Sequence, residues 1–175
     1  VTTLAAQIAV QEQGMFIVSS AGNSGLKSWR IVTVPADAPD VLTVGATERE
    51  GFLKIGYSSE GPEYIDYLKP DVAVYSPNGT SFSSPSVAGF VACLMEYAPH
   101  LSNIELLDIV RKSAALYPYG NNFVGYGVPD AEIALALIDN LGMNKKEKPN
   151  LPRVVEGSKK VKIFLNNRPL SDIIF

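Results

Sequence analysis

Two continuous apolar runs, Met15–Ser19 and Val41–Ala46, most strongly constrain the fold of this chain. Runs of this kind, without polar alternation, are typical of strands that are buried on both faces of a parallel sheet. Val72–Tyr75 is a third, shorter run. Segments with the apolar spacing of helices lie around these runs. The pattern predicts an α/β fold with a mainly parallel sheet flanked by helices.

Four segments have the pattern of helices. Each is bounded by residues that commonly start or stop a helix, such as Gly14 after the first and Gly142 after the last. The four expected helices are Thr2–Gln13, Ser81–Tyr97, Asn103–Ala115 and a last one opened by Pro129 and Asp130 that runs through Leu141. The second contains the apolar stretch Val87–Tyr97, which predicts a buried helix.

The charge balance changes sharply near Gly142. Residues 1–141 hold 7 Lys and Arg against 15 Asp and Glu, whereas residues 142–175 hold 8 against 3. We therefore expect one domain over 1–141, followed over 142–175 by a basic linker and the start of a β-type accessory module. The basic part is short and lacks interleaved aromatic residues, so we predict no nucleic-acid binding. Its elements would be a linker at Asn144–Pro152, a strand at Val161–Leu165, a turn at Asn166-Asn167 and a partner strand beginning at Ile173-Ile174.

Several classes of protein and site are not indicated. No apolar run is long enough to span a bilayer, and Val1–Val10 has neither the basic leader nor the cleavage site of a signal peptide. The single cysteine, Cys93, cannot form an internal disulfide, and we expect it to pack as a small apolar side chain in its helix. No His/Cys cluster has zinc spacing, and no Asp-x-Asp-x-Asp-Gly calcium loop is present. We predict neither a metal nor a cofactor.

Two polar segments could carry chemistry. Ser81 follows Gly79-Thr80 at the start of the expected helix, where backbone N–H groups and the helix dipole favour negative charge. A serine there can also be a simple helix cap. Asn23, in Ser20–Gly25, follows a predicted strand at the sheet edge where ligand-handling groups collect, although Gly-Asn-Ser-Gly alone is only a turn. Together, the amide of Asn23 and the N–H of Ser81 could bind the oxyanion of an acyl-transfer reaction.

These two segments resemble the nucleophile motif and the oxyanion-asparagine motif of the subtilisin-like serine proteases, in that family's order. Five further segments are similar to family motifs, and the resemblance covers most of residues 1–141. These five are Val34-Pro35-Ala36, Val41–Ala46, Tyr57–Pro62, Lys69–Val72 and Gly125–Ala131.

The resemblance implies a Ser-His-Asp protease in which Ser81 is the nucleophile and Asn23 the oxyanion donor. It also implies a pocket for the residue before the scissile bond, walled by Ser20, Ala21 and Gly22 and by the segment from Thr33 to Ala36. Thr33 would shorten this pocket, so we expect a preference for small or medium apolar residues. The Val34–Pro35 bond is a candidate for the cis form, as in relatives.

The chain departs from the family pattern in its histidine. His100 lies at the far end of the helix begun by Ser81, roughly 25–30 Å away at the rise of an α-helix, so it cannot be the general base. We expect a surface histidine near a helix C-terminus. The family's Asp and His motifs precede its Asn motif, so the resemblance implies that both lie before Val1. The chain would then be the C-terminal part of a catalytic domain, incomplete on its N-terminal side and inactive alone.

Two consequences follow from an incomplete domain. The sheet edge at Met15–Ser19 would lack its neighbouring strands, so we expect it to bind the missing N-terminal part of the domain or to self-associate. In addition, only Val72–Asn78 separates Asp71 from Gly79, a shorter excursion than in the family, which would alter the substrate cleft.

The function that we predict is a serine endopeptidase acting on protein substrates, secreted or at the cell surface as the resemblance implies. The alternative is a non-catalytic binding or scaffold module that uses the protease fold. Upstream sequence with an Asp-containing strand end and a His-Gly-Thr helix start would favour the enzyme. A different serine hydrolase, such as an esterase, would need Gly-x-Ser-x-Gly, which residues 79–83 do not match.

Overall fold

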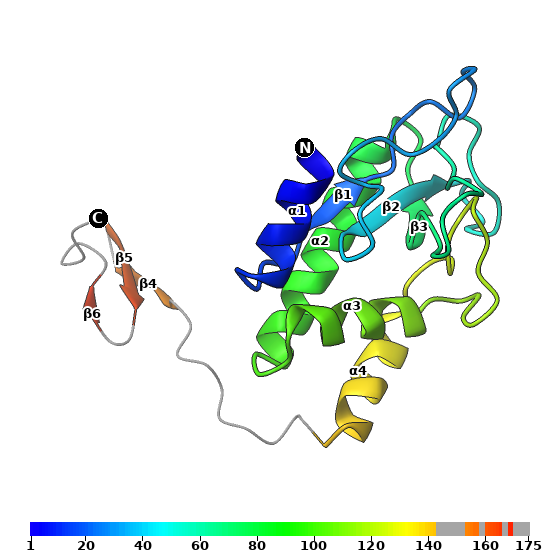
Figure 1. The fold of residues 1–175 in the computed structure, drawn as a ribbon. Coiled ribbons are helices and arrows are strands. Elements are labelled where there is room, and N and C mark those ends of the chain that lie inside the picture. The colour runs from blue at the N-terminus through cyan, green and yellow to red at the C-terminus, as the bar shows by residue number, and fades with distance from the viewer. Residues whose placement is uncertain (143–152, 158–159, 166–167, 170–175) are drawn as a thin grey trace. The chain divides into compact units, whose positions relative to one another are not determined.

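The computed structural model describes residues 1–142, 153–157, 160–165 and 168–169 (Figure 1). The chain divides into two compact units, Val1–Asn144 and Lys145–Phe175. The first contains a three-stranded parallel sheet with the order β1 (Val18–Ser20), β2 (Leu42–Thr47) and β3 (Val72–Tyr75). The predicted α/β fold with a parallel sheet is therefore confirmed.

The central strand, β2, forms the middle of the core, and all six of its residues are buried. Its neighbours are held in register by pairs such as Val18 with Leu42 and Val44 with Val72. β3 has the predicted bounds. β1 is shorter than the predicted run: Met15 is 53% exposed and lies outside it, and its three residues are only half-buried because no described strand covers its outer edge.

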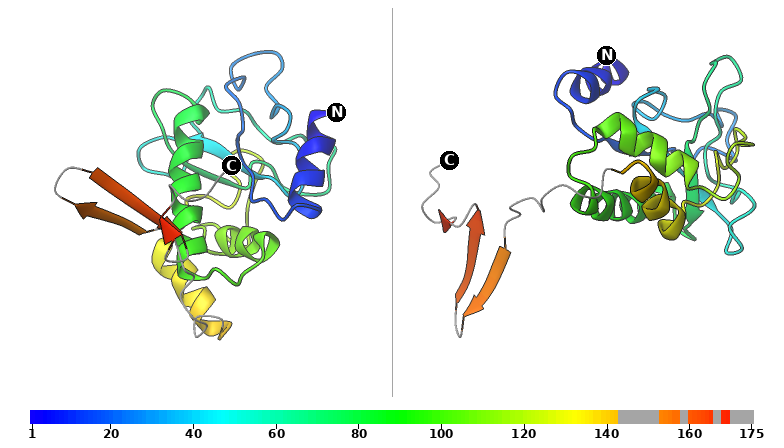
Figure 2. Two further views of the ribbon diagram at one scale, coloured as in Figure 1. Left: turned by 90° about the vertical axis from the view of Figure 1, so that its left-hand side faces the viewer. Right: turned by 90° about the horizontal axis from the view of Figure 1, so that it is seen from below.

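Helices lie on both faces of the sheet. α2 (Thr80–Tyr97) crosses one face, and α3 (Asn103–Lys112) and α4 (Ala131–Asn140) pack with it in the main apolar cluster. α1 (Thr2–Gln11) lies on the other side of the strands (Figure 2), where Ala6 and Val10 pack against Ala38 and Val41. None of the helices in the described part of the chain is long and apolar enough to cross a membrane.

Local signals define the helix ends. α3 begins with a capping box, in which the Ser102 side chain accepts from the backbone of Glu105 and the Glu105 carboxylate accepts from the backbone of Ser102. The Asp130 side chain caps α4, and Gly142 adopts φ 66° beyond its end, as expected of a helix stop. The predicted cis Val34–Pro35 bond is present, together with two cis bonds that were not predicted, Lys69–Pro70 and Tyr117–Pro118.

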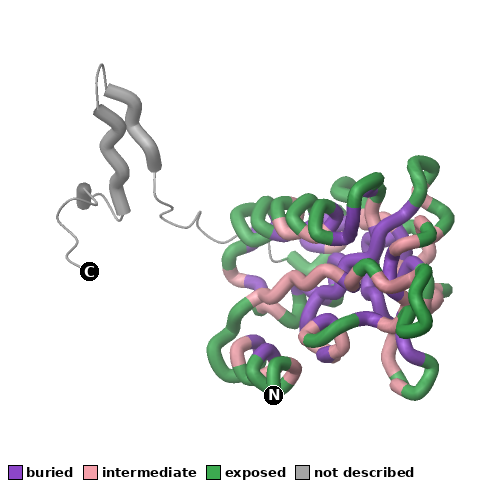
Figure 3. Tube along the Cα trace, turned by 90° about the horizontal axis from the view of Figure 1, so that it is seen from above, coloured by how far each residue is buried: buried purple, intermediate pink, exposed green. Residues whose placement is uncertain are grey.

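The prediction that α2 is a buried helix, with Cys93 packed inside, is wrong for one face. α2 buries residues spaced three or four apart, from Thr80 through Val87 and Val91 to Leu94. The opposite face is solvent-accessible, and it includes Cys93 and the 64% exposed Phe82. Apolar residues occur on all sides of α2, but only one side packs against the sheet. The turns that face outward are coloured as exposed in Figure 3.

The second unit contains three antiparallel strands, β4 (Arg153–Gly157), β5 (Lys160–Leu165) and β6 (Arg168–Pro169). β5 matches the predicted strand, whereas β4 was not predicted. The expected linker, the Asn-Asn turn and the final strand at Ile173-Ile174 lie outside the described residues. The predicted division near Gly142 and the role of the second part stay predictions.

Candidate functional site

Ser81 is the second residue of α2. The helix is preceded by the N-cap residue Gly79, whose φ of 128° lies outside the conformations that L side chains adopt readily and which has no side chain with which to cap the helix. Ser81 is therefore not a capping serine. Its side chain is exposed, and no described residue forms a hydrogen bond with its hydroxyl. Because the first N–H groups of a helix lack acceptors within it, both the hydroxyl and the N–H of Ser81 are open to a ligand.

Asn23 lies beside the start of the same helix. Its Oδ1 accepts from the backbone N–H of Thr80 at 2.9 Å and from Thr80 Oγ1 at 3.0 Å. Thr80 Oγ1 in turn accepts from the backbone N–H of Gly22 at 3.1 Å. Since the amide oxygen is fully engaged, the amide nitrogen is left as a donor. A Cβ on Gly79 would lie 3.2 Å from this Nδ2, which shows how closely the amide approaches the turn before Ser81.

The predicted pocket residues come together as well. The backbone N–H of Thr33 donates to Ala21 O at 3.2 Å, and a Cβ on Gly22 would lie 3.2 Å from Thr33 Oγ1 and 3.0 Å from Ser59 Oγ. Ser20 ends β1 directly before this segment. Ser59 was missed by the sequence reasoning: it is buried, and its Oγ accepts from the N–H of Ser24 at 3.0 Å. Its segment was matched to the family, but nothing in the sequence distinguished it from its serine neighbour.

The loop after Thr33 is held by side chains from elsewhere in the fold. We call residues 36–41 the anchored loop, because four of its carbonyl oxygens accept side-chain hydrogen bonds. The donors are Thr43 Oγ1 to Ala36 O at 2.6 Å, Tyr67 Oη to Asp37 O at 2.7 Å, Arg111 Nη2 to Pro39 O at 3.0 Å and Lys69 Nζ to Val41 O at 2.6 Å. These bonds fix the backbone that continues from the pocket wall.

Two of those donors belong to a buried ion-pair network around Asp71. Its carboxylate accepts from Lys69 Nζ at 2.8 Å, from Arg111 Nε at 2.8 Å and from the N–H of Thr43 at 2.6 Å. The Lys69 side chain is 0% exposed and that of Asp71 1%. Burial lowers the pKa of Lys69, and the charge of Asp71 opposes this shift.

His100 lies beyond the far end of α2, an 18-residue helix. Eighteen residues at the rise of an α-helix span about 27 Å, so His100 is remote from Ser81. The expectation of a surface histidine is wrong, because both ring nitrogens are buried, without a hydrogen-bond partner among the described residues. His100 is the one histidine of the chain.

Comparisons with known proteins find a family, curated relatives and solved structures that this chain resembles. The model of the subtilase family matches residues 2–127. Subtilisin DY of Bacillus licheniformis is 33% identical over 132 residues, which cover 69% of this chain and 47% of that protein. Among solved structures, MycP1 from the ESX-1 type VII secretion system has a TM-score of 0.60 and 27% identity, over 75% of this chain and 44% of that one. The self-cleaved protease domain of PatA has a TM-score of 0.63 at 22% identity, over 79% and 55%. The chain spans about half the length of the curated relatives that it matches.

Proposed function

The chain belongs to the subtilase family of peptidases, and we propose that it is the part of a serine endopeptidase domain that carries the nucleophile, Ser81, and the oxyanion donor, Asn23. The observation that supports this most directly is the orientation of the Asn23 amide. Thr80 occupies its oxygen with two hydrogen bonds, so the free Nδ2 lies next to the turn that presents Ser81.

In the proposed reaction, Ser81 Oγ attacks the carbonyl carbon of a peptide bond, and its proton passes to a general base. The tetrahedral oxyanion accepts hydrogen bonds from Asn23 Nδ2 and from the N–H of Ser81, where the N-terminal end of α2 adds a favourable dipole. Collapse expels the amine, which takes the proton, and water then hydrolyses the acyl-enzyme. We propose that the base and its orienting carboxylate come from a segment outside this chain, so the isolated chain is inactive.

The substrate that we propose is a protein or peptide with a small or medium apolar residue before the scissile bond. The pocket walls would be Ser20, Ala21, Gly22 and Thr33. The Thr33 side chain supports a short pocket, because its Oγ1 would lie only 3.2 Å from a Cβ on Gly22 and so takes up space beside the backbone at Gly22. Family membership is also the basis for proposing a secreted or cell-surface location.

The partner that we propose for the sheet is the remainder of the protease domain, paired along β1. The outer edge of β3 is covered, since Ala73 N donates to Gly127 O at 3.0 Å. The outer edge of β1 carries no described strand, and α2 exposes apolar side chains such as Phe82 and Met95. A strand beside β1 and a helix against α2 would cover both.

A fluorophosphonate probe, which labels activated serines, tests the proposal. The isolated chain should label negligibly, because catalysis without the base falls by several orders of magnitude. The intact protein should label at Ser81, and Ser81→Ala should abolish both labelling and peptide hydrolysis. Asn23→Ala should keep labelling but lower kcat by about 10²–10³-fold, a range measured on a subtilisin, a member of this family. Strong labelling of the isolated chain would refute the proposal that the general base comes from a segment outside this chain.

One observation favours a second function, a non-catalytic scaffold with the protease fold: the lone histidine is remote from Ser81. In that case the intact protein would neither label nor hydrolyse peptides, and Ser81→Ala would leave its partner binding unchanged. A cleavage profile of the intact protein also tests the pocket, since a preference for Arg or Phe before the scissile bond would contradict the proposed role of Thr33.

A further inference from the structure

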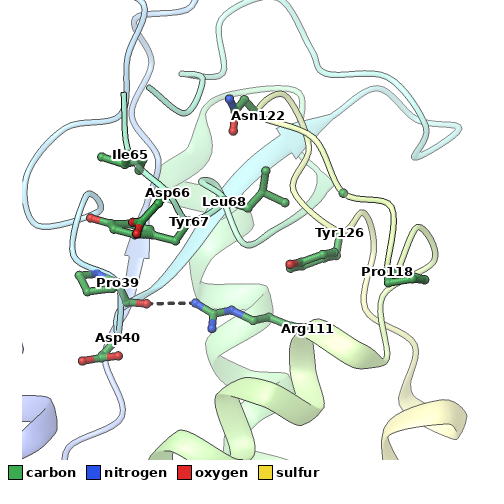
Figure 4. Close-up of a pocket in the computed structure, with 11 residues that line it drawn as sticks. Pro39, Asp40, Ile65, Asp66, Tyr67, Leu68, Arg111, Pro118, Asn122 and Tyr126 are labelled. Atoms are coloured by element: carbon green, nitrogen blue, oxygen red, sulfur yellow. Dashed lines mark hydrogen bonds between the residues drawn. The ribbon is translucent and has the colours of Figure 1, made fainter. Parts of the chain in front are cut away.

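A pocket of about 620 Å³ lies between the anchored loop, the segment 65–68 and the C-terminal end of α3 (Figure 4). Asp40, Asp66, Tyr67, Leu68, Arg111 and Tyr126 are among its lining residues. None of the lining residues is assigned above to catalysis or to the substrate pocket. A volume of this size lies within the range of pockets that bind small molecules or side chains.

The charge that faces this pocket is negative. Asp40 and Asp66 line it and Asp37 lies nearby, and none of the three belongs to an ion pair of the described residues. The Oδ2 of Asp40 accepts from Gln11 Nε2 and Asp37 accepts from Thr3 Oγ1, but both donors are neutral. Burial raises the pKa of Tyr67, and the charges of Asp37 and Asp66 raise it further, as expected of uncompensated carboxylates close to its hydroxyl.

The positive charges at the base of the pocket are already engaged. Arg111 donates from Nε to Asp71 and from Nη2 to Pro39 O, the bond drawn in Figure 4. Lys69 is fully buried against the same Asp71 carboxylate. Together these three residues carry one net positive charge, which the two lining carboxylates of Asp40 and Asp66 outweigh. The pocket therefore favours a cation.

The walls indicate which kind of cation fits. Tyr67 and Tyr126 are half-buried, and both line the pocket with aromatic side chains. Leu68 lines it with an aliphatic side chain. Aromatic faces attract guanidinium and ammonium groups, and aliphatic surface covers the stem of a long basic side chain. A bare metal ion would leave most of the volume empty, and the described residues include no group of three or more His, Cys, Asp or Glu side chains that could hold one.

We propose that this pocket binds an arginine or lysine side chain of a peptide segment in a protein partner. The cationic head lies between Asp40 and Asp66, and the stem packs between Tyr67, Leu68 and Tyr126. The site requires neither Ser81 nor Asn23. It therefore goes beyond the proposed catalytic function and is tested without measuring activity.

The test is a titration of the isotope-labelled full chain, followed by NMR, with a capped peptide containing two arginines. The matched peptide has citrulline, a neutral isostere, in place of each arginine. We expect chemical-shift changes at Leu68 and Tyr126, and about tenfold weaker binding of the citrulline peptide. The variant Asp40→Asn/Asp66→Asn should also bind the arginine peptide about tenfold more weakly, as expected for two partly screened charge pairs.

The control variant Glu96→Gln/Glu132→Gln removes two exposed carboxylates of other helices and should bind like the wild type. The titration is repeated with Lys145, Lys146 and Lys148 replaced by glutamine, so that the chain's own basic segment cannot compete. Absence of binding in both forms would overturn the proposal. So would equal binding of the citrulline peptide, an equal loss in the control variant, or displacement of the peptide by millimolar Mg²⁺, which would indicate a simple cation site.

Discussion

Replacing Asp71 with asparagine perturbs the buried network at its centre. The substitution keeps the shape of the side chain but removes the charge that Lys69 and Arg111 share. Lys69, 0% exposed, would then hold a buried ammonium without a counterion. Breaking a buried ion pair by removing one partner costs about 3–5 kcal/mol. Because domains are stable by only about 5–15 kcal/mol, Asp71→Asn should lose a large part of the free energy of unfolding at pH 7.

The loss should depend on pH in a defined direction. Burial already lowers the pKa of Lys69 below 10.5 in the folded chain, and Asp71 limits that shift, so removing the carboxylate lowers the pKa further. Between the folded value and the unfolded value of about 10.5, the unfolded state binds more protons, and stability rises with pH. In the Asp71→Asn variant, the pH range over which stability rises begins at a lower pH, because the folded pKa of Lys69 is lower. The difference in stability between Asp71→Asn and the wild type should therefore narrow as pH rises from 7 toward 10.

Urea unfolding followed by circular dichroism at several pH values measures both effects. The matched control is Asp108→Asn, which removes an exposed ion pair with Lys112 and should cost only about 0.3–0.5 kcal/mol. The double variant Lys69→Met/Asp71→Asn should regain part of the lost stability, because the orphaned ammonium is gone. A loss below about 1 kcal/mol for Asp71→Asn, or a difference that does not change with pH, would refute the reasoning.

Four further predictions address a helix cap, two glycines and the sheet edge. Ser102→Ala should cost about 1 kcal/mol in urea unfolding, because it removes the cap of α3. Gly125→Ala should cost at least about 2 kcal/mol, since φ is +63° and a Cβ would lie 2.2 Å from Asp71 O; Gly89→Ala, where a Cβ meets nothing within 4 Å in mid-helix, should instead gain about 0.5–1 kcal/mol. The isolated chain should self-associate along β1 in light scattering, and a monomer at all concentrations tested would count against the open edge.

The sequence predicted well those elements whose signal is local. Val72–Tyr75 has the strand bounds expected from its apolar run, and two helices start where they were predicted, at Asn103 and after Asp130. Cys93 was misplaced because an all-round apolar helix gives no period from which to choose the buried face. Burial of such a helix depends on what packs against it.

Long-range contacts were the part that sequence reasoning could not supply. Arg111 reaches Asp71 across 40 positions, and Asn23 reaches Thr80 across 57. For Asn23 and Ser81, the resemblance to a family indicated that the two belong to one site, although their roles stay predictions. Lys69 and Ser59 also lie in segments that resemble the family, but the resemblance did not indicate that these two side chains are buried. Charge and polarity in a sequence do not reveal which groups become buried.

In the anchored loop, the backbone path is determined by residues outside the loop, whereas the chemistry of the surface is determined by the loop's own side chains. Its carbonyl positions are set by donors in β2, in the segment 67–69 and in α3, so its own side chains are free of that task. Protein engineers who exchange loop side chains such as Asp37 or Asp40 should alter the surface chemistry while the backbone path persists. To change the backbone path itself, they would have to substitute the donor residues outside the loop. Among these donors, Tyr67 should cost the least stability when it is replaced, because it is half-buried and lies outside the ion-pair network.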